Sequence, residues 1–441
     1  MSKRDDRFLG EALQATLENA VRAPFYRERY GARWRRVKTL DDLARLPILD
    51  KATAIQHQRQ LIVGRPPPGF GVASSGTTRN SPDQAPLNVV TSEAELEAMN
   101  ASAPAYEPAD DPHPGWTLVS VSVKHGLPGG PPGPGELFLP WMHHPNALHM
   151  MHAVLSRPQP DGRRVTAMRI SVGALKCLTA WCLEHGKGPA HYGVRLIGTN
   201  SFHLSSHWRD LIERSFEAEV IDNYSLSEFS TPVSECKACG WHHFGWPPII
   251  YEVLDLKSGR RIGKGTGRLL LTGVYPYAQK MPLIRYDTGD VLELGPRCRE
   301  TGQRGVRFLG RLRRGLVVAD GDRGAFALAP VHVQDVLEGL PEAERAAHPL
   351  QTLGFVRSRD IGLPRWTVEL KRRPRPLARL AFEVRFDPDV FPERALELAR
   401  HVRDEMLRRD PALRRLRRRR LLSLEVRVAP AGTLAPPADK A

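Results

Sequence analysis

Alternating strand and helix patterns in the middle of the chain limit its fold more than any other feature of the sequence. Three short apolar segments are predicted as strands, at Val165–Ile170, Val194–Gly198 and Glu219–Asn223. Two segments between them have apolar residues at helical spacing, at Val172–His185 and Trp208–Ser215. Strands that alternate with helices fold into a sheet covered by helices. The sequence therefore predicts a layered α/β domain.

The C-terminal part has a different pattern. The chain has 441 residues, which is too long for one compact core and indicates a large domain followed by a smaller one. Helices are predicted over Leu328–Leu340 and Glu393–Arg408, and strands at Thr367–Lys371, Ala381–Phe386 and Leu422–Val428. We therefore expect a small α+β domain at this end.

Composition excludes several classes of protein. Hydrophobic residues make up 41% of the chain, as in folded globular proteins, and no apolar run is long enough to predict a transmembrane helix. The N-terminal residues lack the apolar segment of a signal peptide, and five cysteines are too few for a disulfide framework. We expect a cytoplasmic protein that does not insert into membranes.

The formal net charge is +15, and arginines concentrate at Arg372–Arg379 and Arg414–Arg420. A strongly basic chain is typical of proteins that bind nucleic acid or another polyanion. Because no zinc-finger spacing or RNA-recognition motif accompanies the charge, we do not expect nucleic acid as a partner. We favour arginine-rich solvated faces that also assist the binding of an anionic ligand.

A loop rich in serine and threonine, Val72–Pro82, is the first candidate binding site. After a segment rich in proline and glycine come five small residues: Ser74, Ser75, Gly76, Thr77 and Thr78. Small hydroxyl residues around a glycine can direct N–H and O–H groups toward one anion, of which phosphate is the natural example. The spacing is not that of a Walker loop. The alternative is an ordinary serine- and threonine-rich turn.

Two later stretches carry aromatic and acidic residues. Tyr224 and Glu228 follow a predicted strand, so their side chains would project where open α/β sheets bind ligands. Asp287 and Asp290 lie in a predicted tight turn, where a carboxylate can accept hydrogen bonds from both hydroxyls of a ribose. The alternatives are a core tyrosine with a solvated glutamate, and an ordinary Asx turn.

Taken in order, these motifs resemble those of the acyl-adenylate-forming superfamily, specifically the branch of phenylacetate–coenzyme A ligase and coenzyme F390 synthetase. That branch carries a Ser-Ser-Gly-Thr-Thr loop, a Tyr-Gly-Leu-Ser-Glu turn, an Ile-Arg-Tyr-x-Thr-Gly-Asp turn and a Gly-Arg hinge, similar to residues 74–78, 224–228, 284–290 and 310–311 here. An early Pro24-Phe-Tyr-Arg and a Leu-Pro-x-x-x-Lys motif ending at Lys51 also resemble the branch. The resemblance spans nearly the whole chain.

The resemblance implies an AMP-binding adenylation domain over residues 1–310 and a small, mobile, ferredoxin-like domain over residues 311–441. It implies an enzyme that uses ATP and magnesium to convert a carboxylic acid, aryl or related, to acyl-AMP. The acyl group would then pass to coenzyme A to give a thioester. A homodimer is left open.

The resemblance also implies a role for each matching residue. Ser74–Thr78 would hold the ATP phosphates, Tyr224 would stack on adenine, and Glu228 would help hold magnesium. Asp290 would bind the ribose with assistance from Arg311. Lys440, in a tail similar to the Gly-Thr-Leu-Pro segment of the branch, would steady the carboxylate and the α-phosphate; the alternative is a solvated lysine.

The sequence departs from the branch at Arg79 and Ser225, which replace glycines, and at Arg313 and Arg314, where an aspartate is expected. These departures leave two alternatives open. One is an adenylating enzyme whose acceptor is an amine or a carrier-protein thiol. The other is a degenerate, non-catalytic nucleotide-binding homologue.

The superfamily is thought to rotate its small domain between its two half-reactions, around a pivot that matches Gly310–Arg314. Glycine and arginine can both adopt the backbone angles of such a pivot. The charge of the two arginines favours the arrangement that brings them near phosphate. We therefore expect thioester formation to be the slower half-reaction.

A Cys-x-x-C pair, Cys236 and Cys239, precedes His242 and His243, and Cys298 follows later. Three thiolates and one imidazole can form a closed tetrahedral zinc site, and some members of the related branch carry zinc in this region. We expect a structural zinc held by the three cysteines and His242, with His243 as the alternative ligand. No thioredoxin-like context supports a redox dithiol.

The two remaining cysteines are expected in the core, and one tryptophan and two histidines are expected near a pocket. Cys177 and Cys182 lie on a predicted helix and are expected in the core. Trp141, His143 and His144 follow a loop rich in glycine and proline and are candidates to line a pocket for the acid.

Overall fold

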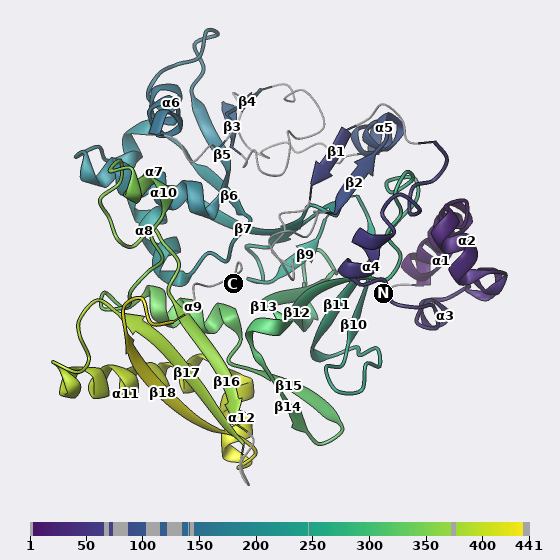
Figure 1. Ribbon diagram of the computed structural model, residues 1–441. Coiled ribbons are helices and arrows are strands. Elements are labelled where there is room, and N and C mark those ends of the chain that lie inside the picture. The colour runs from purple at the N-terminus through teal and green to yellow at the C-terminus, as the bar shows by residue number, and fades with distance from the viewer. Residues whose placement is uncertain are drawn as a thin grey trace.

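The computed structural model describes residues 3–65, 70–73, 87–102, 115–120, 135–139, 141, 145–245, 247–371 and 376–434. An eleven-stranded mixed sheet forms the centre of the molecule, and a separate three-stranded sheet lies near the C-terminus (Figure 1). Among the described residues, no helix is long and apolar enough to cross a membrane.

One half of the central sheet is parallel. Its five strands are β3 (Trp116–Ser120), β4 (Glu136–Phe138), β5 (Val165–Ser171), β6 (Leu196–Asn200) and β7 (Glu219–Leu226). Three helices and a 3-10 turn pack with it: α6 (Pro145–Ser156), α7 (Val172–Glu184), η3 (Pro189–Tyr192) and α8 (Ser206–Phe216). The side chains of Ser171 and Ser205 cap the first turns of α7 and α8. The predicted layered α/β domain is confirmed.

The other half of the sheet is antiparallel. Its strands are β8 (Phe229–Glu235), β9 (His242–Phe244), β10 (Ile249–Leu254), β11 (Gly265–Gly273), β12 (Tyr286–Arg297) and β13 (Arg304–Arg311). The strand order is β10-β11-β12-β13-β9-β8-β7-β6-β5-β3-β4. Since β7 pairs in parallel with β6 and antiparallel with β8, it joins the two halves.

Two predicted turns are strands in the structure. The strand predicted to end at Asn223 continues through Tyr224 to Leu226, because β8 supplies an antiparallel partner, and the turn falls at Ser227 and Glu228. The segment from Asp287 to Asp290 belongs to β12, where the pairing with β11 shifts register. Both segments become strands by pairing with a neighbouring strand, and the pattern within one segment does not show that pairing.

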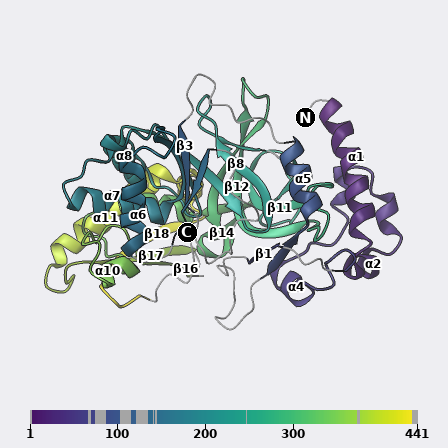
Figure 2. The ribbon, with the colours of Figure 1, turned by 90° about the horizontal axis from the view of Figure 1, so that it is seen from above.

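The N-terminal elements pack on the antiparallel half, at the opposite end of the molecule from α7 and α8 (Figure 2). They are α1 (Lys3–Ala20), α2 (Pro24–Tyr30), η1 (Arg33–Arg36), α3 (Leu40–Leu43), α4 (Lys51–Gln56), β1 (Phe70–Ala73), β2 (Asn88–Thr91) and α5 (Glu93–Ser102). Arg285, a buried residue just before β12, joins them to the sheet. Its guanidinium donates to the Glu252 carboxylate at 2.8 and 3.0 Å and to the carbonyl oxygen of Ala44 at 2.9 Å.

The C-terminal part folds around its own apolar core as a small α+β domain. It contains η4 (Leu312–Arg314), β14 (Leu316–Asp320), β15 (Arg323–Ala327), α9 (Pro330–Glu338), α10 (Pro349–Thr352), β16 (Trp366–Lys371), β17 (Leu377–Val384), α11 (Pro392–Arg409), α12 (Pro411–Arg418) and β18 (Ser423–Pro430). β17 pairs antiparallel with β16 and parallel with β18. Figure 1 shows α9 between this sheet and α8 of the large domain.

Candidate functional site

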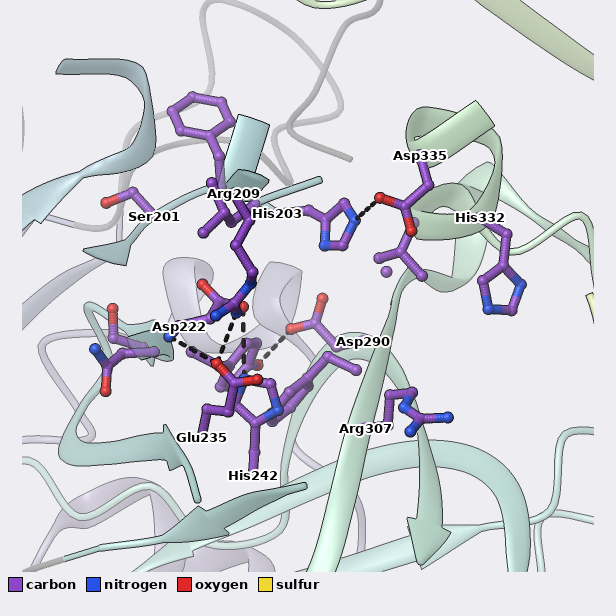
Figure 3. A pocket seen from close by; sticks show the side chains of 18 of the residues that line it. Ser201, His203, Arg209, Asp222, Glu235, His242, Asp290, Arg307, His332 and Asp335 are labelled. Carbon is purple, nitrogen blue, oxygen red and sulfur yellow. Dashed lines mark hydrogen bonds and ion pairs between the residues drawn. The ribbon is translucent and has the colours of Figure 1, made fainter. Parts of the chain in front are cut away.

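A cavity of about 440 Å³ lies where the large domain meets α9. Most of its lining comes from the loop after β6, the C-terminal half of β7, the end of β13, and α9, and single residues of α8, β8, β12 and α11 complete it together with Gly240 and His242. Figure 3 shows charged side chains from these segments converging on the cavity. Since open α/β sheets bind ligands beyond the carboxyl ends of their strands, the position of the cavity is that of a ligand site.

Asp290 lies at the centre of one group of side chains in this cavity. Its carboxylate accepts a hydrogen bond from the Tyr224 hydroxyl at 2.6 Å and lies 3.2 Å from Nε of Arg311. Asp290 and Arg311 are opposite each other in the pairing of β12 with β13. Burial raises the pKa of Tyr224, so the hydroxyl stays a neutral donor. Three residues expected at the nucleotide site therefore lie together.

The ring of Tyr224 is stacked on Phe308 of β13, with 3.6 Å between ring centroids and 10° between ring planes. Both rings line the cavity. One face of Tyr224 is therefore occupied, and a planar ligand would have to stack on the opposite face. The sequence analysis did not anticipate Phe308, although it lies in the Phe-Leu-Gly-Arg stretch that precedes the predicted hinge.

A second group of polar side chains surrounds Asp222 of β7. Asp222 accepts a hydrogen bond from the Thr199 hydroxyl at 2.9 Å and lies 3.5 Å from Nε2 of His242. Burial acts to raise the pKa of Asp222, but His242, His203 and Thr199 together outweigh it and the pKa is lowered. Beside them, Arg209 donates to Glu235 at 2.6 Å (Figure 3). Asp222 thus remains an ionised acceptor facing the cavity, a role that the sequence analysis did not assign to it.

On the opposite wall of the cavity, His203 of the loop after β6 contacts Asp335 of α9, with 3.1 Å between Nε2 and Oδ1 (Figure 3). Burial alone would lower the pKa of His203, but the carboxylates of Asp335, Asp222 and Glu338 together outweigh it and raise the pKa. The imidazole is therefore more readily protonated than a free histidine. This contact joins the two domains across the cavity.

Glu228 lies in the hairpin turn between β7 and β8 and does not line this cavity. Its Oε1 atom accepts hydrogen bonds from Nζ of Lys51 at 3.0 Å and from the Tyr286 hydroxyl at 2.9 Å. Its charge contributes to the raised pKa of Tyr224, so the two sites are electrostatically connected. Lys51 belongs to the early Leu-Pro-x-x-x-Lys motif, which was the only sequence signal for it.

Several predicted residues lie outside the described part of the chain. They are the five residues of the phosphate loop, Ser74, Ser75, Gly76, Thr77 and Thr78, together with Arg79, His143, His144 and Lys440. Trp141 is described and is buried in the core with Cys177 and Cys182, so it packs as a core residue rather than lining the cavity. Arg314 lies over the ring of Trp366 within the small domain.

The thiols of Cys236, Cys239 and Cys298 gather next to the cavity with the imidazole of His243, all ligand atoms within 4.8 Å of one another. Tight turns present them: Gly240 donates to the carbonyl of Cys236, and Gly302 to that of Cys298. The structure places His243, and not the expected His242, with the three thiols. Neighbouring residues of a strand point to opposite faces, so on β9 His242 points to Asp222 and His243 to the thiols.

Two of the four side chains have pKa shifts that favour binding of a metal. Hydrogen bonds from the backbone N–H and the side chain of Thr301 lower the pKa of Cys298 to about 7. Burial lowers the pKa of His243, which keeps the imidazole neutral and able to act as a ligand. Sγ of Cys236 lies 4.0 Å from Sγ of Cys298, near the ~3.8 Å edge expected of a tetrahedron with metal–sulfur bonds of about 2.3 Å.

Comparisons with known proteins give a clear result for the fold. No protein-family profile and no curated protein sequence matches this chain. The solved structure of 2-hydroxyisobutyryl-CoA ligase in an open conformation, in complex with 2-HIB-AMP and CoA, is similar at 17% identity over 98% of this chain and 89% of that chain, with a TM-score of 0.64. Its postadenylation state with R3-HIB-AMP is similar at 16% identity over 100% and 89%, with a TM-score of 0.62.

The same ligase in its thioesterification state is similar at 15% identity over 99% of this chain and 88% of that chain, with a TM-score of 0.56. The similarity covers the large and the small domain alike. The chain therefore has the two-domain fold of the acyl-adenylate-forming ligases.

Proposed function

We propose that this protein is an ATP-dependent acid–thiol ligase. In the first half-reaction an oxygen of the substrate carboxylate attacks the α-phosphorus of ATP. The new bond gives acyl-AMP, and the bond to the bridging oxygen breaks so that pyrophosphate leaves with the electron pair. In the second half-reaction a thiolate attacks the acyl carbon and AMP leaves. The protein has to align these groups and stabilise the charge that develops on oxygen.

The observation that carries the proposal is the group formed by Asp290, Tyr224 and Arg311 in the cavity between the domains. A carboxylate beside an arginine is a strong acceptor for ribose hydroxyls. The stacked pair of Tyr224 and Phe308 offers one aromatic face to adenine. A chain with the fold of a ligase whose solved structures contain acyl-AMP would use such a group to hold AMP.

The other assignments are part of the same proposal. Ser74–Thr78 would bind the triphosphate, and Lys440 would balance charge at the α-phosphate. Magnesium prefers carboxylate oxygens, and Glu228 is a suitable ligand because Lys51 and Tyr286 contact only its Oε1 atom among the described residues. Magnesium would supply positive charge to the phosphates.

The acid is proposed to be aryl or a related carboxylic acid, as in phenylacetate–CoA ligase, and the acceptor to be coenzyme A. Two alternatives concern the acceptor and the chemistry. An amine or a carrier-protein thiol would change only the second half-reaction. A degenerate nucleotide-binding protein would bind ATP without releasing pyrophosphate.

One experiment separates these functions. Pyrophosphate release from ATP is measured with the purified protein against a panel of aryl and short alkyl acids, with no acid as the control. We expect release that depends on one group of acids, and formation of a thioester when coenzyme A is added. Binding of ATP without release under any acid would contradict the proposal. Release of pyrophosphate without formation of a thioester would mean that the acceptor in the second half-reaction is not coenzyme A.

We also propose that Cys236, Cys239, Cys298 and His243 hold a structural zinc ion. All four positions of a tetrahedron would be filled by protein, so the ion would brace the turns beside β7 rather than activate water. The cluster fits such an ion in the type, number and spacing of its donors.

Zinc removal is expected to destabilise the protein. Elemental analysis should find about one equivalent of zinc in purified protein, and a chelator should lower the thermal midpoint by several degrees, since binding of a structural ion contributes to folding. His243→Gln should lower the zinc content, whereas His242→Gln, its neighbour on the other face of β9, should retain it. Equal retention of zinc by both variants would contradict the ligand assignment.

A further inference from the structure

The interface between the two domains contains a buried ion pair. Nζ of Lys176 on α7 lies 2.7 Å from Oε1 of Glu338 on α9. The side chain of Lys176 is 2% exposed and that of Glu338 is 0% exposed. The two residues are 162 positions apart in the sequence and belong to different domains.

Three neighbouring side chains stabilise the charges of this pair. Glu338 accepts further hydrogen bonds from Nε2 of Gln334 at 2.9 Å and from the hydroxyl of Ser205. The Lys176 ammonium lies 5.1 Å from the ring centroid of Trp208, over its face. Burial lowers the pKa of Lys176, and Glu338 opposes that shift. Each of the two buried charges is therefore compensated only while Lys176 and Glu338 remain in contact.

A second contact lies beside the first at the edge of the cavity. Asp335 of α9 accepts hydrogen bonds from the backbone N–H of Ser206 at 3.0 Å and from His203 at 3.1 Å. His203 and Asp335 both line the cavity, as Figure 3 shows. The polar face of α9 thus closes one wall of the candidate nucleotide site.

The opposite face of α9 belongs to the small domain. Val333, Val336 and Leu337 pack in the core that contains the three-stranded sheet. Gly310, at the predicted pivot, has φ +100 and lies so close to Pro330 that a Cβ atom there would approach Pro330 Cβ to 2.8 Å. A rotation of the small domain around this pivot would carry α9 with it and separate Lys176 from Glu338.

A segment after α9 provides a second attachment of the small domain to the large domain. Residues 349–361, here called the anchor segment, place Leu350, Val356 and Ile361 in the core of the large domain. Glu184 of α7 accepts hydrogen bonds from the backbone N–H groups of Arg357 at 2.8 Å and Ser358 at 2.6 Å. Loss of the ion pair would therefore loosen the interface without freeing the small domain.

We propose that Lys176 and Glu338 are positioning residues that hold α9 docked against the cavity. Docking completes the cavity wall for the nucleotide, and any motion of α9 has to separate two buried charges. Separation of a buried pair is costly because each partner is left without compensation, whereas replacement of both by apolar residues removes the charges altogether. The functional part of this proposal rests on the proposed ATP-dependent reaction; the docking itself does not.

Amide hydrogen exchange of the full-length protein tests the docking without substrate. Lys176→Met should raise exchange at least about tenfold in α9 and in the first turn of α8, because an unpaired Glu338 is left buried. The double variant Lys176→Met/Glu338→Leu should return exchange in both segments close to the unmodified level. Glu425→Gln is the matched control, since its partner Arg379 lies within the small-domain sheet and not at the interface.

Unchanged exchange in Lys176→Met, or no recovery in the double variant, would overturn the proposal. If Lys176→Met unfolds the large domain, Asp335→Asn, at the edge of the same interface, should raise exchange in α9 with the rest of the fold intact. Where acid-dependent pyrophosphate release is observed, the single variant should raise KM for ATP about tenfold and the double variant should restore it. Absence of that release would overturn the proposed function while leaving the exchange result valid.

Discussion

Replacement of Asp290 with asparagine is expected to lower kcat/KM for ATP in acyl-AMP formation by about 10- to 100-fold. Hydrogen bonds to a charged group contribute about 1.5–3 kcal/mol, and the amide has lost the charge that ribose hydroxyls would meet. Arg311 would also lose its ionic partner at 3.2 Å. The loss should appear mainly as a higher KM for ATP, because ribose is bound before and during the reaction.

Asp287→Asn is the matched control for this prediction. Asp287 lies in the same strand, pairs with Arg268, and does not line the cavity. Its replacement should leave KM for ATP near the unmodified value. Equal kinetics of Asp290→Asn and the unmodified protein, with circular dichroism showing the fold intact in both, would refute the nucleotide assignment.

Replacement of Glu228 with glutamine is expected to lower the rate of acyl-AMP formation by about 10²-fold or more. A carboxylate that holds magnesium at the phosphates acts on charge that develops in the transition state, so its loss should lower kcat. The amide keeps the size of the side chain but cannot balance the ammonium of Lys51 at 3.0 Å. A rate measured as pyrophosphate release across a magnesium titration should stay low at all concentrations.

Glu219→Gln serves as the control for Glu228. Glu219 begins β7, and its side chain pairs with Lys237 at the surface. This variant should release pyrophosphate at the normal rate. If Glu228→Gln also reaches that rate when magnesium is raised, the carboxylate assists metal binding but is not needed in the transition state.

Much of the fold could be predicted because its signals are local. The strands and helices between Val165 and Asn223 follow short apolar patterns within each segment, and the structure contains each of them. The antiparallel half was harder to predict. Its strands β8 to β13 are defined by how they pair with one another, which the pattern of a single segment does not show, so the segment around Asp287 looked like a turn although it lies in a strand.

In the candidate site, too, some features could be predicted from the sequence and others could not. Tyr224, Asp290 and Arg311 were predicted from motifs, and the structure brings them together. The choice between His242 and His243 could not be made from spacing, because it depends on which face of β9 meets the thiols. Lys51 lies 177 residues from Glu228, and Lys176 lies 162 residues from Glu338. The spacing of residues within one segment cannot predict a contact between residues so far apart in the sequence.

The anchor segment determines how this protein can be divided or recombined. A fragment that began at residue 311 would carry Leu350, Val356 and Ile361 without the core that they fill. Exposed apolar side chains of this kind promote aggregation. Exchange of C-terminal domains between related ligases would therefore require that α7 and the segment over 349–361 be transferred from the same parent.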